Sequence, residues 1–229
     1  MNKYEALTKL KTLPDGIYEA AKERSGDDGF DFIYDQFEEK KITNAIEIGT
    51  FLGHGTAYIA AACSNRNGKV YTIEIDKTLA HTAQALIEHV GLSENVDFIL
   101  GDSLAELPKL LKRIPAFQAA YIDGHHSYKY VSQEFKLIYE AIDKTRPFLI
   151  ILDDACYEHN DSRGDGTGPK IIETPNGPCQ FVISDVYYQR NNPSDGGVPR
   201  LVNEHNMTVT KGCAFVDETT KIIFEGNEK

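Results

Sequence analysis

The sequence predicts a single α/β domain, residues 1–229, built on a doubly wound, mostly parallel, Rossmann-like sheet with an antiparallel C-terminal hairpin. Three observations support this fold class. Short apolar segments typical of buried strands alternate with helix-forming stretches between residues 45 and 155. A glycine-rich loop follows the first of these strands. Residues 201–229 contain the alternation of apolar and polar residues that is typical of antiparallel strands.

The N-terminal segment, residues 1–40, is expected to be helical and charged, with breaks at 14–16 and 25–29 where Pro, Gly and Asp gather. Large apolar residues recur in it at helical spacing, so the segment is expected to pack an apolar face on the core. These residues are Phe30, Ile33, Tyr34 and Phe37. Two further roles stay open for the segment: a dimer contact, which would make the protein a homo-oligomer, and part of a lid.

From residue 45 onward the predicted strands and helices alternate regularly. Strands are expected over residues 45–48, 70–75, 96–100, 117–122 and 148–152. Helices are expected over residues 56–63, 77–90, 104–113 and 128–143. Asp76 can cap the helix that follows it, and Gly91 can end that helix. Pro108 interrupts the interior of the helix over 104–113.

The pattern changes after the fifth predicted strand. Residues 157–170 and 191–199 are rich in Gly, Asn, Asp, Ser and Pro, which indicates loops, and residues 179–189 between them could be a helix. The tail is predicted to form two antiparallel strands, 207–216 and 221–224, joined near residues 217–218.

Composition narrows the class of protein. A chain of 229 residues suits one sizeable core, and its formal net charge of −11 argues against nucleic acid as a general partner. The apolar runs are too short for a membrane span, and the first residues lack the pattern of a secretory signal, so we expect a cytoplasmic protein. The cysteines lack C-x-x-C spacing and are expected to be reduced thiols without zinc; they are Cys63, Cys156, Cys179 and Cys213.

The glycine-rich loop contains Gly49, Gly53 and Gly55. Such a loop forms a ligand crevice at the carboxyl end of the first strand of an α/β sheet. The dinucleotide pattern G-x-G-x-x-G fails because its third glycine position is Tyr58, and a P-loop fails because no Gly-Lys-Ser/Thr follows. What remains is E-x-G-x-x-x-G-x-G, which begins at Glu47. The other interpretation is a turn that serves only close packing of helix on strand.

Acidic and polar residues also stand at the ends of the second and third predicted strands. Glu74 is placed to accept hydrogen bonds from a ribose, although it could be only a solvated carboxylate at a strand end. Asp76 competes for this role, but its position suits a helix cap better. Asp102 and Ser103 are placed to meet an adenine edge, although such a pair is more often turn chemistry.

Three carboxylates follow the fourth and fifth predicted strands: Asp123, Asp153 and Asp154. Because the carboxyl ends of parallel strands open on one crevice, these carboxylates are expected to lie close together. Clustered carboxylates repel one another unless a cation joins them, and their oxygens favour a hard ion such as Mg²⁺, Ca²⁺ or Mn²⁺. The other interpretation is three separate strand-end residues that face water.

Two histidines follow Asp123 closely, His125 and His126. A neutral imidazole next to a cation-bound hydroxyl could remove its proton, because the cation lowers the pKa of that hydroxyl. Either histidine could instead be a metal ligand or a packed side chain. His54, in the glycine-rich loop, is expected to line or close a ligand pocket.

Together these motifs resemble, in order, those of metal-dependent O-methyltransferases with the class I S-adenosylmethionine-dependent fold. Residues 47–56 resemble the cofactor loop, and 72–75 resemble the ribose segment of catechol O-methyltransferase. Residues 101–103 match the adenine-side segment. Residues 122–128 are similar to the Asp-Gly-x-His segment of bacterial sugar O-methyltransferases that act on macrolides and related natural products. The resemblance covers roughly residues 45–155.

The resemblance implies two cofactors, S-adenosylmethionine and a divalent cation, expected to be Mg²⁺. It implies that Asp123, Asp153 and Asp154 bind the metal and that His126 is the base. Catechol-type enzymes have a lysine at the base position, so His126 favours the sugar-type relatives. The residues expected to contact S-adenosylmethionine are Glu47, Gly49, Thr50, Phe51, Gly53, Gly55, Thr56, Glu74, Ile75, Asp102, Ser103 and Asp123. One departure is Arg146-Pro-Phe before the fifth strand, where relatives have Pro-Gly-Gly.

We therefore expect an enzyme that transfers a methyl group to a hydroxyl of a small molecule, with a sugar or natural product favoured as acceptor. Residues 155–200 are expected to form the acceptor pocket or its lid. Other functions stay open: a metal-independent methyltransferase or hydroxylase relative of the same fold, a non-catalytic cofactor-binding module, and a nicotinamide oxidoreductase.

Overall fold

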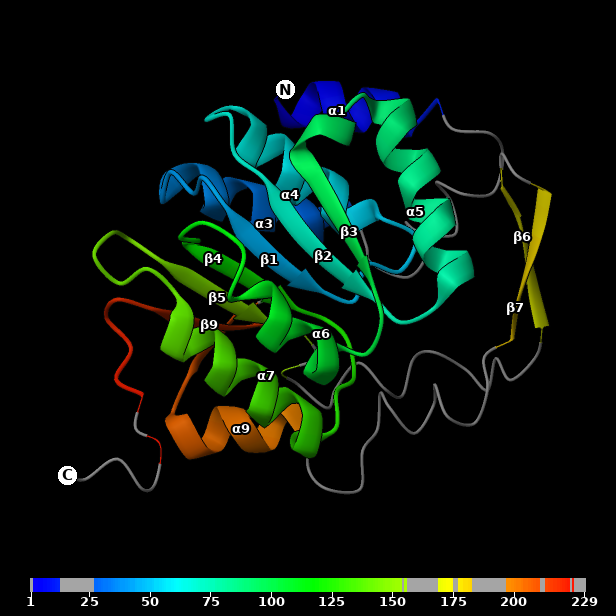
Figure 1. Cartoon of the computed structure of the whole chain (residues 1–229). Helices are drawn as coiled ribbons and strands as arrows, with labels where there is room; N and C mark the ends of the chain where they lie inside the picture. Colours follow the sequence, from blue (N-terminus) through cyan, green and yellow to red (C-terminus); the bar gives the residue numbers. More distant parts are fainter. Residues whose placement is uncertain are drawn as a thin grey trace.

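A seven-stranded sheet forms the centre of the molecule in the computed structural model, which describes residues 2–12, 27–153, 155, 169–174, 177–182, 197–210, 213–222 and 224 (Figure 1). The strand order is β3-β2-β1-β4-β5-β9-β8. The strands are β1 Ala45–Ile48, β2 Val70–Glu74, β3 Val96–Leu100, β4 Ala119–Ile122, β5 Leu149–Leu152, β8 Thr208–Thr210 and β9 Cys213–Asp217.

The first five strands pair in parallel, and β9 runs antiparallel to both β5 and β8. This confirms the predicted fold class, a mostly parallel doubly wound sheet with an antiparallel pair at the C-terminus. The strand order reverses between β1 and β4, which are neighbours in the sheet. In doubly wound folds such a reversal opens a crevice at the carboxyl ends of the strands, and ligands bind there.

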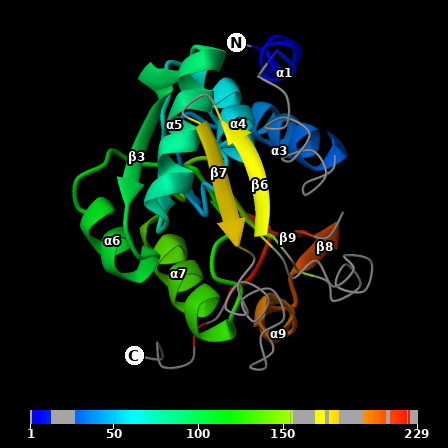
Figure 2. The ribbon, with the colours of Figure 1, turned by 90° about the vertical axis from the view of Figure 1, so that its right-hand side faces the viewer.

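Helices cover both faces of the sheet (Figures 1 and 2). One face carries α1 Lys3–Leu10, α3 Asp27–Glu39, α4 His54–Ser64 and α5 Lys77–Val90. The other face carries α6 Ser103–Leu110, α7 Tyr128–Ala141 and α9 Gly197–His205. A short 3₁₀ turn, Ser93–Asn95, leads into β3. All residues of β1, β2, β4 and β5 are buried because both faces are covered, which explains their apolar composition.

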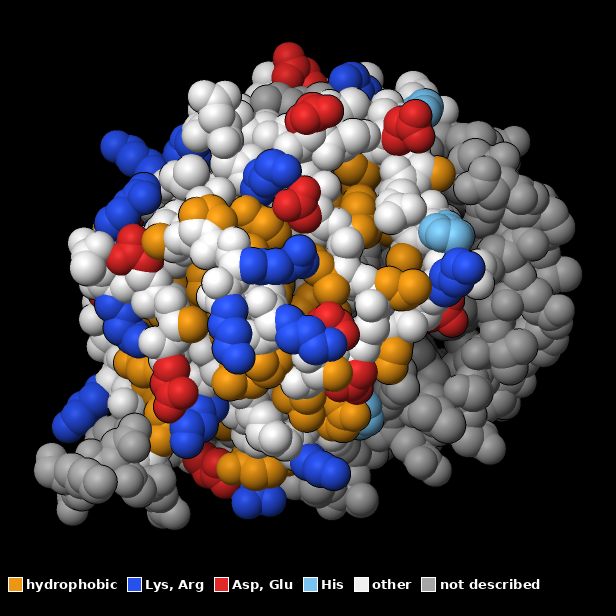
Figure 3. All heavy atoms as spheres, in the orientation of Figure 1, with side chains coloured by type: hydrophobic (Ala, Val, Ile, Leu, Met, Phe, Trp, Pro, Cys, Tyr) orange, Lys and Arg blue, Asp and Glu red, His pale blue; other side chains and the backbone are white. Residues whose placement is uncertain are grey.

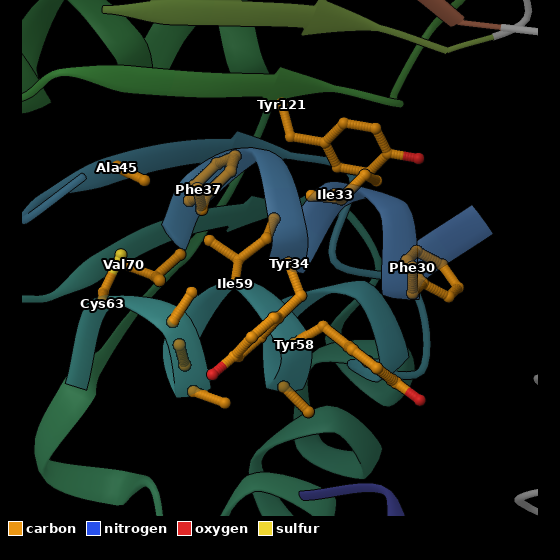
Figure 4. Packing of buried hydrophobic residues seen from close by; sticks show 14 of the residues in the cluster. Phe30, Ile33, Tyr34, Phe37, Ala45, Tyr58, Ile59, Cys63, Val70 and Tyr121 are labelled. Atoms are coloured by element: carbon orange, nitrogen blue, oxygen red, sulfur yellow. The ribbon is translucent and has the colours of Figure 1, made fainter. Parts of the chain in front are cut away.

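The predicted apolar face of the N-terminal segment is present on α3. Phe30, Ile33, Tyr34 and Phe37 are all buried in one cluster with Tyr58, Ile59 and Cys63 of α4, and Tyr34 points toward that helix (Figure 4). This contact closes one side of the core. The helix begins at Asp27, so it includes part of the break expected at residues 25–29, whereas residues 14–16 lie outside the described residues.

The predicted caps of α5 are confirmed. The Asp76 carboxylate accepts hydrogen bonds from the backbone N–H groups of Thr78 and Leu79, at 2.7 and 3.0 Å. Gly91 ends the helix with φ +82°, a left-handed conformation that suits glycine. Pro108 lies within α6, which continues to Leu110 rather than to the predicted residue 113.

The C-terminal part differs from the sequence prediction in three places. The last hairpin pairs β8 with β9, both within the stretch 207–216 that was predicted as one strand, and the predicted turn at 217–218 follows β9. Residues 179–182, predicted as helix, belong to β7 Gly177–Val182, which pairs with β6 Pro169–Thr174 in a separate two-stranded sheet. Residues 197–205, predicted as the end of a loop and the start of the strands, form α9.

The sequence did not predict α9, because the helix begins with Gly197-Val-Pro199, a combination typical of turns. Proline is tolerated in the first turn of a helix because the N–H groups there have no partner inside the helix. Val198, Leu201 and Val202 are buried with apolar residues of α7. The burial of these residues against α7 outweighs the weak local preference of the segment for a turn.

The surface seen in Figure 3 carries Lys and Arg side chains scattered among hydrophobic and acidic ones, without one large area of a single charge. Among the described helices, none is both long and apolar enough to span a bilayer.

Candidate active site

The candidate site lies at the carboxyl ends of β1 to β5, where the strand order reverses. Each of the five strands is followed by residues of the candidate site. The glycine-rich loop follows β1, further segments follow β2, β3 and β4, and Asp153 follows β5. The parallel register brings Thr72, Glu47 and Tyr121 side by side on adjacent strands. Asp123 and Asp153 continue the same alternation, two residues beyond Tyr121 and Ile151.

The three glycines of the loop are each explained by a contact within the protein. A Cβ on Gly49 would lie 2.0 Å from the backbone oxygen of Asp123, and Gly49 has φ +92°. A Cβ on Gly53 would meet Ala83 at 2.9 Å, and one on Gly55 would meet Phe30 at 2.8 Å. Close packing therefore requires glycine at these three positions, with or without a bound ligand.

Glu47 is a buried carboxyl group at the centre of this region. Its Oε2 accepts hydrogen bonds from the hydroxyls of Thr56 at 2.5 Å and Thr72 at 2.6 Å. Burial raises the pKa of Glu47 to about 8, although the two hydroxyls oppose the shift. Glu47 therefore binds a proton more tightly in the folded than in the unfolded protein.

This difference predicts a pH dependence of stability. Because the folded-state pKa lies above the unfolded value, the contribution of Glu47 is fully present below about pH 4.5 and is lost as the pH rises through 8. Glu47→Gln keeps an oxygen for both threonines and cannot ionise. Relative to the wild type, the variant should therefore gain roughly 3–5 kcal/mol of unfolding free energy between pH 5 and pH 8.5.

Urea unfolding at the two pH values measures this effect. Glu88→Gln, on the exposed side of α5, is the matched control and should show no such gain. An equal change in both variants would mean that Glu47 is ionised at neutral pH in the folded protein.

Glu74 is the last residue of β2, and its carboxylate accepts hydrogen bonds from two backbone N–H groups. Its Oε2 accepts from the N–H of Phe51 at 2.8 Å, and its Oε1 accepts from the N–H of Asp76 at 2.9 Å. Burial raises the pKa of Glu74. The next residue, Ile75, is 52% exposed, which is unusual for a side chain of this size. Phe51 has φ +50°, so the loop after β1 bends sharply where it meets Glu74.

Asp102 and Ser103 stand at the end of β3 and make contacts within the protein. Asp102 caps α6 by accepting from the N–H of Ala105 at 3.1 Å, and its other oxygen accepts from the Tyr130 hydroxyl at 3.0 Å. Ser103 donates a hydrogen bond to Glu134 of α7. The turn chemistry considered for this pair is therefore present. The His125 ring stacks on Tyr130 at 4.3 Å between centroids.

Asp123 and Asp153 meet at a tyrosine. The Tyr121 hydroxyl lies 3.3 Å from Oδ2 of Asp123 and 3.2 Å from Oδ2 of Asp153, so its proton is shared between two carboxylates. Burial and the two carboxylates raise the pKa of Tyr121 well above its ordinary value, and the phenol stays protonated. The Cys213 thiol of β9 donates to Oδ1 of Asp153 at 3.3 Å. Asp154 lies outside the described residues.

Of the three expected metal ligands, the structure describes two, Asp123 and Asp153. Within the described part of the chain, no group of three or more His, Cys, Asp or Glu residues is arranged to hold a metal ion. Asp123 and Asp153 are nevertheless brought together, although they are 30 positions apart in the sequence.

The three histidines considered from the sequence have different surroundings. His126 is buried, and its Nε2 lies 3.4 Å from Oδ1 of Asp123. His125 accepts a hydrogen bond from the N–H of Ser127 at 3.3 Å and stacks on Tyr130. His54 packs edge-on against Phe30, with 5.3 Å between ring centroids. The ring of His54 thus belongs to the packing of α3 on α4.

Sequence reasoning missed three residues at the site: Tyr121, Cys213 and Glu134. Tyr121 lies inside an apolar strand, and Cys213 lies in a strand whose partner was unknown. Glu134 alone carried a signal, because it occurs next to Phe135 on the apolar side of a helix otherwise marked by Val131 and Ile138. A carboxylate at such a position indicates a buried polar partner.

Comparison with known proteins identifies methyltransferases as similar to this chain. The profile of a family described as a methyltransferase domain matches residues 46–155. A catechol O-methyltransferase of Niastella koreensis is 33% identical over 82 residues, which are 35% of this chain and 37% of the relative. The match therefore spans little more than a third of the length of that relative.

Two solved structures share the fold over nearly the whole chain. An O-methyltransferase from Bacillus cereus, in complex with S-adenosylhomocysteine, aligns with TM-score 0.60 and 19% identity, covering 95% of this chain and 90% of the other. The O-methyltransferase TomG from Streptomyces achromogenes, in complex with S-adenosylmethionine, aligns with TM-score 0.58 and 17% identity, covering 93% and 94%. Residues 46–155 are thus similar to a methyltransferase domain, and the fold of the chain is similar to that of the two O-methyltransferases.

Proposed function

We propose that the protein transfers a methyl group from S-adenosylmethionine to a hydroxyl group of a small molecule, assisted by a divalent cation. The observation that carries the proposal is the meeting of Asp123, Asp153 and His126 at the ends of β4 and β5, next to the crevice where the strand order reverses. A carboxylate pair and a histidine are the groups needed to hold a cation and to accept a proton.

The residues at the ends of β1 and β2 fit S-adenosylmethionine. The Glu74 carboxylate stands at a strand end suited to ribose hydroxyls, and the exposed Ile75 beside it offers an apolar surface to a base. Thr50, Phe51 and Thr56 lie in or next to the glycine-rich loop. They are hydrogen-bonded to Thr72, Glu74 and Glu47, respectively, on β1 and β2. A dinucleotide fits less well, because Tyr58, at the third glycine position of that pattern, is buried and stacks on Phe30.

The surroundings of Tyr121 also fit a divalent cation. Two carboxylates that share one phenol proton retain most of their negative charge, and a hard cation would neutralise it. Asp123 and Asp153 are the proposed ligands, and Asp154, next in sequence, is the third. When bound, the sulfonium supplies the methyl group and the cation supplies positive charge for the acceptor oxygen.

His126 is the proposed base. Its Nε2 faces Asp123 and lies within reach of a hydroxyl held next to that carboxylate. The imidazole of His126 would take the proton of the acceptor hydroxyl, so that the oxygen could accept the methyl group that S-adenosylmethionine would supply when bound, with a neutral thioether as the other product. The protein aligns these groups and keeps the base buried.

The acceptor is proposed to be a small molecule with a free hydroxyl, with a sugar or another natural product favoured. TomG is described as involved in tomaymycin synthesis, and the Niastella relative is named for catechol. A catechol acceptor is therefore tested together with sugars. We propose that residues between 155 and 200 contribute to the acceptor pocket.

Titration of the whole protein with S-adenosylhomocysteine, NAD⁺ and Mn²⁺ tests the proposal. S-adenosylhomocysteine and Mn²⁺ are expected to bind, and NAD⁺ is not. Asp123→Asn should weaken Mn²⁺ binding, followed by electron paramagnetic resonance, by about tenfold or more because a ligand charge is lost. Chelation of metal should stop methyl transfer to a panel of catechols and glycosides.

Asp97→Asn is the matched control, because Asp97 lies at the surface and pairs with Lys69 at 2.9 Å. It should leave Mn²⁺ binding unchanged. Binding of NAD⁺ in place of S-adenosylhomocysteine, or equal Mn²⁺ affinity in both variants, would count against the proposal.

A further inference from the structure

Glu134 is a buried carboxyl group that the proposed function does not use. It lies on α7, it is fully buried, and it shares the face of the helix that carries Val131 and Ile138. That face packs with residues of α6 in one apolar cluster. A carboxylate at such a position lowers stability unless polar groups compensate for the loss of water, so packing alone does not explain it.

The fold compensates for only one of the two oxygens of Glu134. Oε1 accepts a hydrogen bond from the Ser103 hydroxyl. Oε2 is buried and has no hydrogen-bond partner among the residues that the structure describes. Buried acceptors without a partner are uncommon in folded proteins, and each calls for a reason outside packing. We look for that reason at Ser103, the side chain to which Glu134 is bonded.

The bond to Glu134 fixes the direction of the Ser103 hydrogen bond. A hydroxyl carries one proton and can either donate or accept toward a ligand. A carboxylate can only accept, so the Ser103 proton points to Glu134 and the lone pairs of the hydroxyl oxygen are left for another donor. Ser103 is partly exposed at the start of α6, which follows the end of β3. It therefore offers a ligand an acceptor at this place.

The neighbouring Asp102 is an acceptor as well, and α7 holds it too. Its Oδ1 accepts from the N–H of Ala105 at 3.1 Å, and its Oδ2 accepts from the Tyr130 hydroxyl at 3.0 Å. Tyr130 and Glu134 are one helical turn apart on α7, so a single helix orients both residues of the segment. Neither Asp102 nor Ser103 thus has a side-chain proton to offer where an adenine edge is expected.

We propose that Glu134 makes the site selective for the 6-amino group of adenine by keeping the Ser103 oxygen an acceptor. The inference rests on the proposed function, in which the ligand is S-adenosylmethionine. The amino group of adenine donates a hydrogen bond, whereas the 6-oxo group of hypoxanthine only accepts and would face the Ser103 oxygen with no proton between them. Glu134 is thus a positioning residue that acts on specificity through Ser103.

Two ligands that differ at one position of the base test this inference: S-adenosylhomocysteine and S-inosylhomocysteine, which carries the 6-oxo group. Calorimetric titration of the whole protein is run at about pH 8, above the pKa of about 7 to which burial raises Glu134, so that the carboxyl group is charged. The wild type should bind the adenosyl compound about 10–100-fold more tightly, the usual effect of one mispaired hydrogen bond.

Glu134→Leu should lower this ratio of affinities by about tenfold, because the Ser103 hydroxyl is then free to donate to the 6-oxo group. The change should come from tighter binding of S-inosylhomocysteine, with the Kd of S-adenosylhomocysteine changed less than about threefold, since the hydroxyl can still accept from adenine. General damage to the fold would weaken both ligands, so a gain of affinity for one of them identifies the proposed role.

Three further variants separate this role from packing. Glu134→Gln keeps an oxygen that can accept from Ser103 and should retain part of the discrimination. Glu140→Leu, the same change on the exposed side of α7, is the matched control and should keep the wild-type ratio. In a Ser103→Ala background, Glu134→Leu should no longer change the ratio, because the residue through which it acts is absent.

The outcomes distinguish this inference from the proposed function. Equal affinity of the wild type for the two ligands overturns the role of Glu134 alone, and so does an unchanged ratio or an equal weakening of both ligands in Glu134→Leu. A change of the ratio in the Ser103→Ala background also overturns it. A wild-type protein that binds neither ligand overturns the proposed function, and this inference with it.

Discussion

Replacing His126 by alanine should lower kcat for methyl transfer by about 10²–10⁴-fold, the usual contribution of a positioned general base. Cofactor affinity should stay within about threefold, because His126 lies beside Asp123 at the end of β4 rather than against Glu74 at the end of β2. Single-turnover kinetics combined with titration of S-adenosylhomocysteine separates the two quantities.

His125→Ala is the matched control for this variant. The two histidines are adjacent in sequence, but His125 stacks on Tyr130, whose hydroxyl donates to Asp102 near the end of β3. Its loss should therefore act mainly on cofactor affinity and much less on kcat. If the larger loss of kcat followed His125, the assignment of the base would move to that residue.

Replacing Gly49 by alanine should unfold much of the protein, with a loss of unfolding free energy above about 4 kcal/mol. The new Cβ would lie 2.0 Å from the carbonyl oxygen of Asp123 and 2.6 Å from its carbonyl carbon. Both neighbours are backbone atoms at the junction of β1 and β4, where Asp123 N–H donates to the Ile48 oxygen at 2.8 Å. Relief of the overlap would separate these strands and displace Asp123.

Gly91→Ala isolates the backbone contribution to this effect. Gly91 has φ +82°, similar to +92° at Gly49, but a Cβ there would meet only the flexible end of Lys9 at 3.3 Å. Urea unfolding should give a loss of about 1–2 kcal/mol for this variant, from strain alone. Similar losses in the two variants would mean that the strands move apart more easily than the packing indicates.

The parallel half of the fold was predictable because each of its elements carries a local signal. The strands β1, β4 and β5 are short apolar runs, and α5 has a capping aspartate and a terminal glycine, so its predicted bounds match the observed Lys77–Val90. The α3 face was visible as Phe30, Ile33, Tyr34 and Phe37 at helical spacing. In these segments local preference and burial act in the same direction.

The C-terminal part was less predictable because its elements depend on contacts. The position of the last hairpin is determined by the antiparallel register of β9 on β5, which pairs Ala214 with Leu152. Alternation along the tail allowed several turns, and only the position of β5 selects one. The helix α9 likewise depends on α7 for the burial of Val198 and Leu201.

The order of chemical groups along the chain was readable without any structure: acids and glycines after successive strands predict a ligand crevice, since the carboxyl ends of parallel strands share one edge. The resemblance of these segments to methyltransferase motifs implied the ligand. Which atoms meet there was decided by the sheet register and by helix packing. Those contacts join Tyr121 to two aspartates, place Cys213 against Asp153 and bury Glu134 beside Ser103. Residues far apart in sequence approach within hydrogen-bond distance only when the core is assembled, and periodicity carries no information about such pairs.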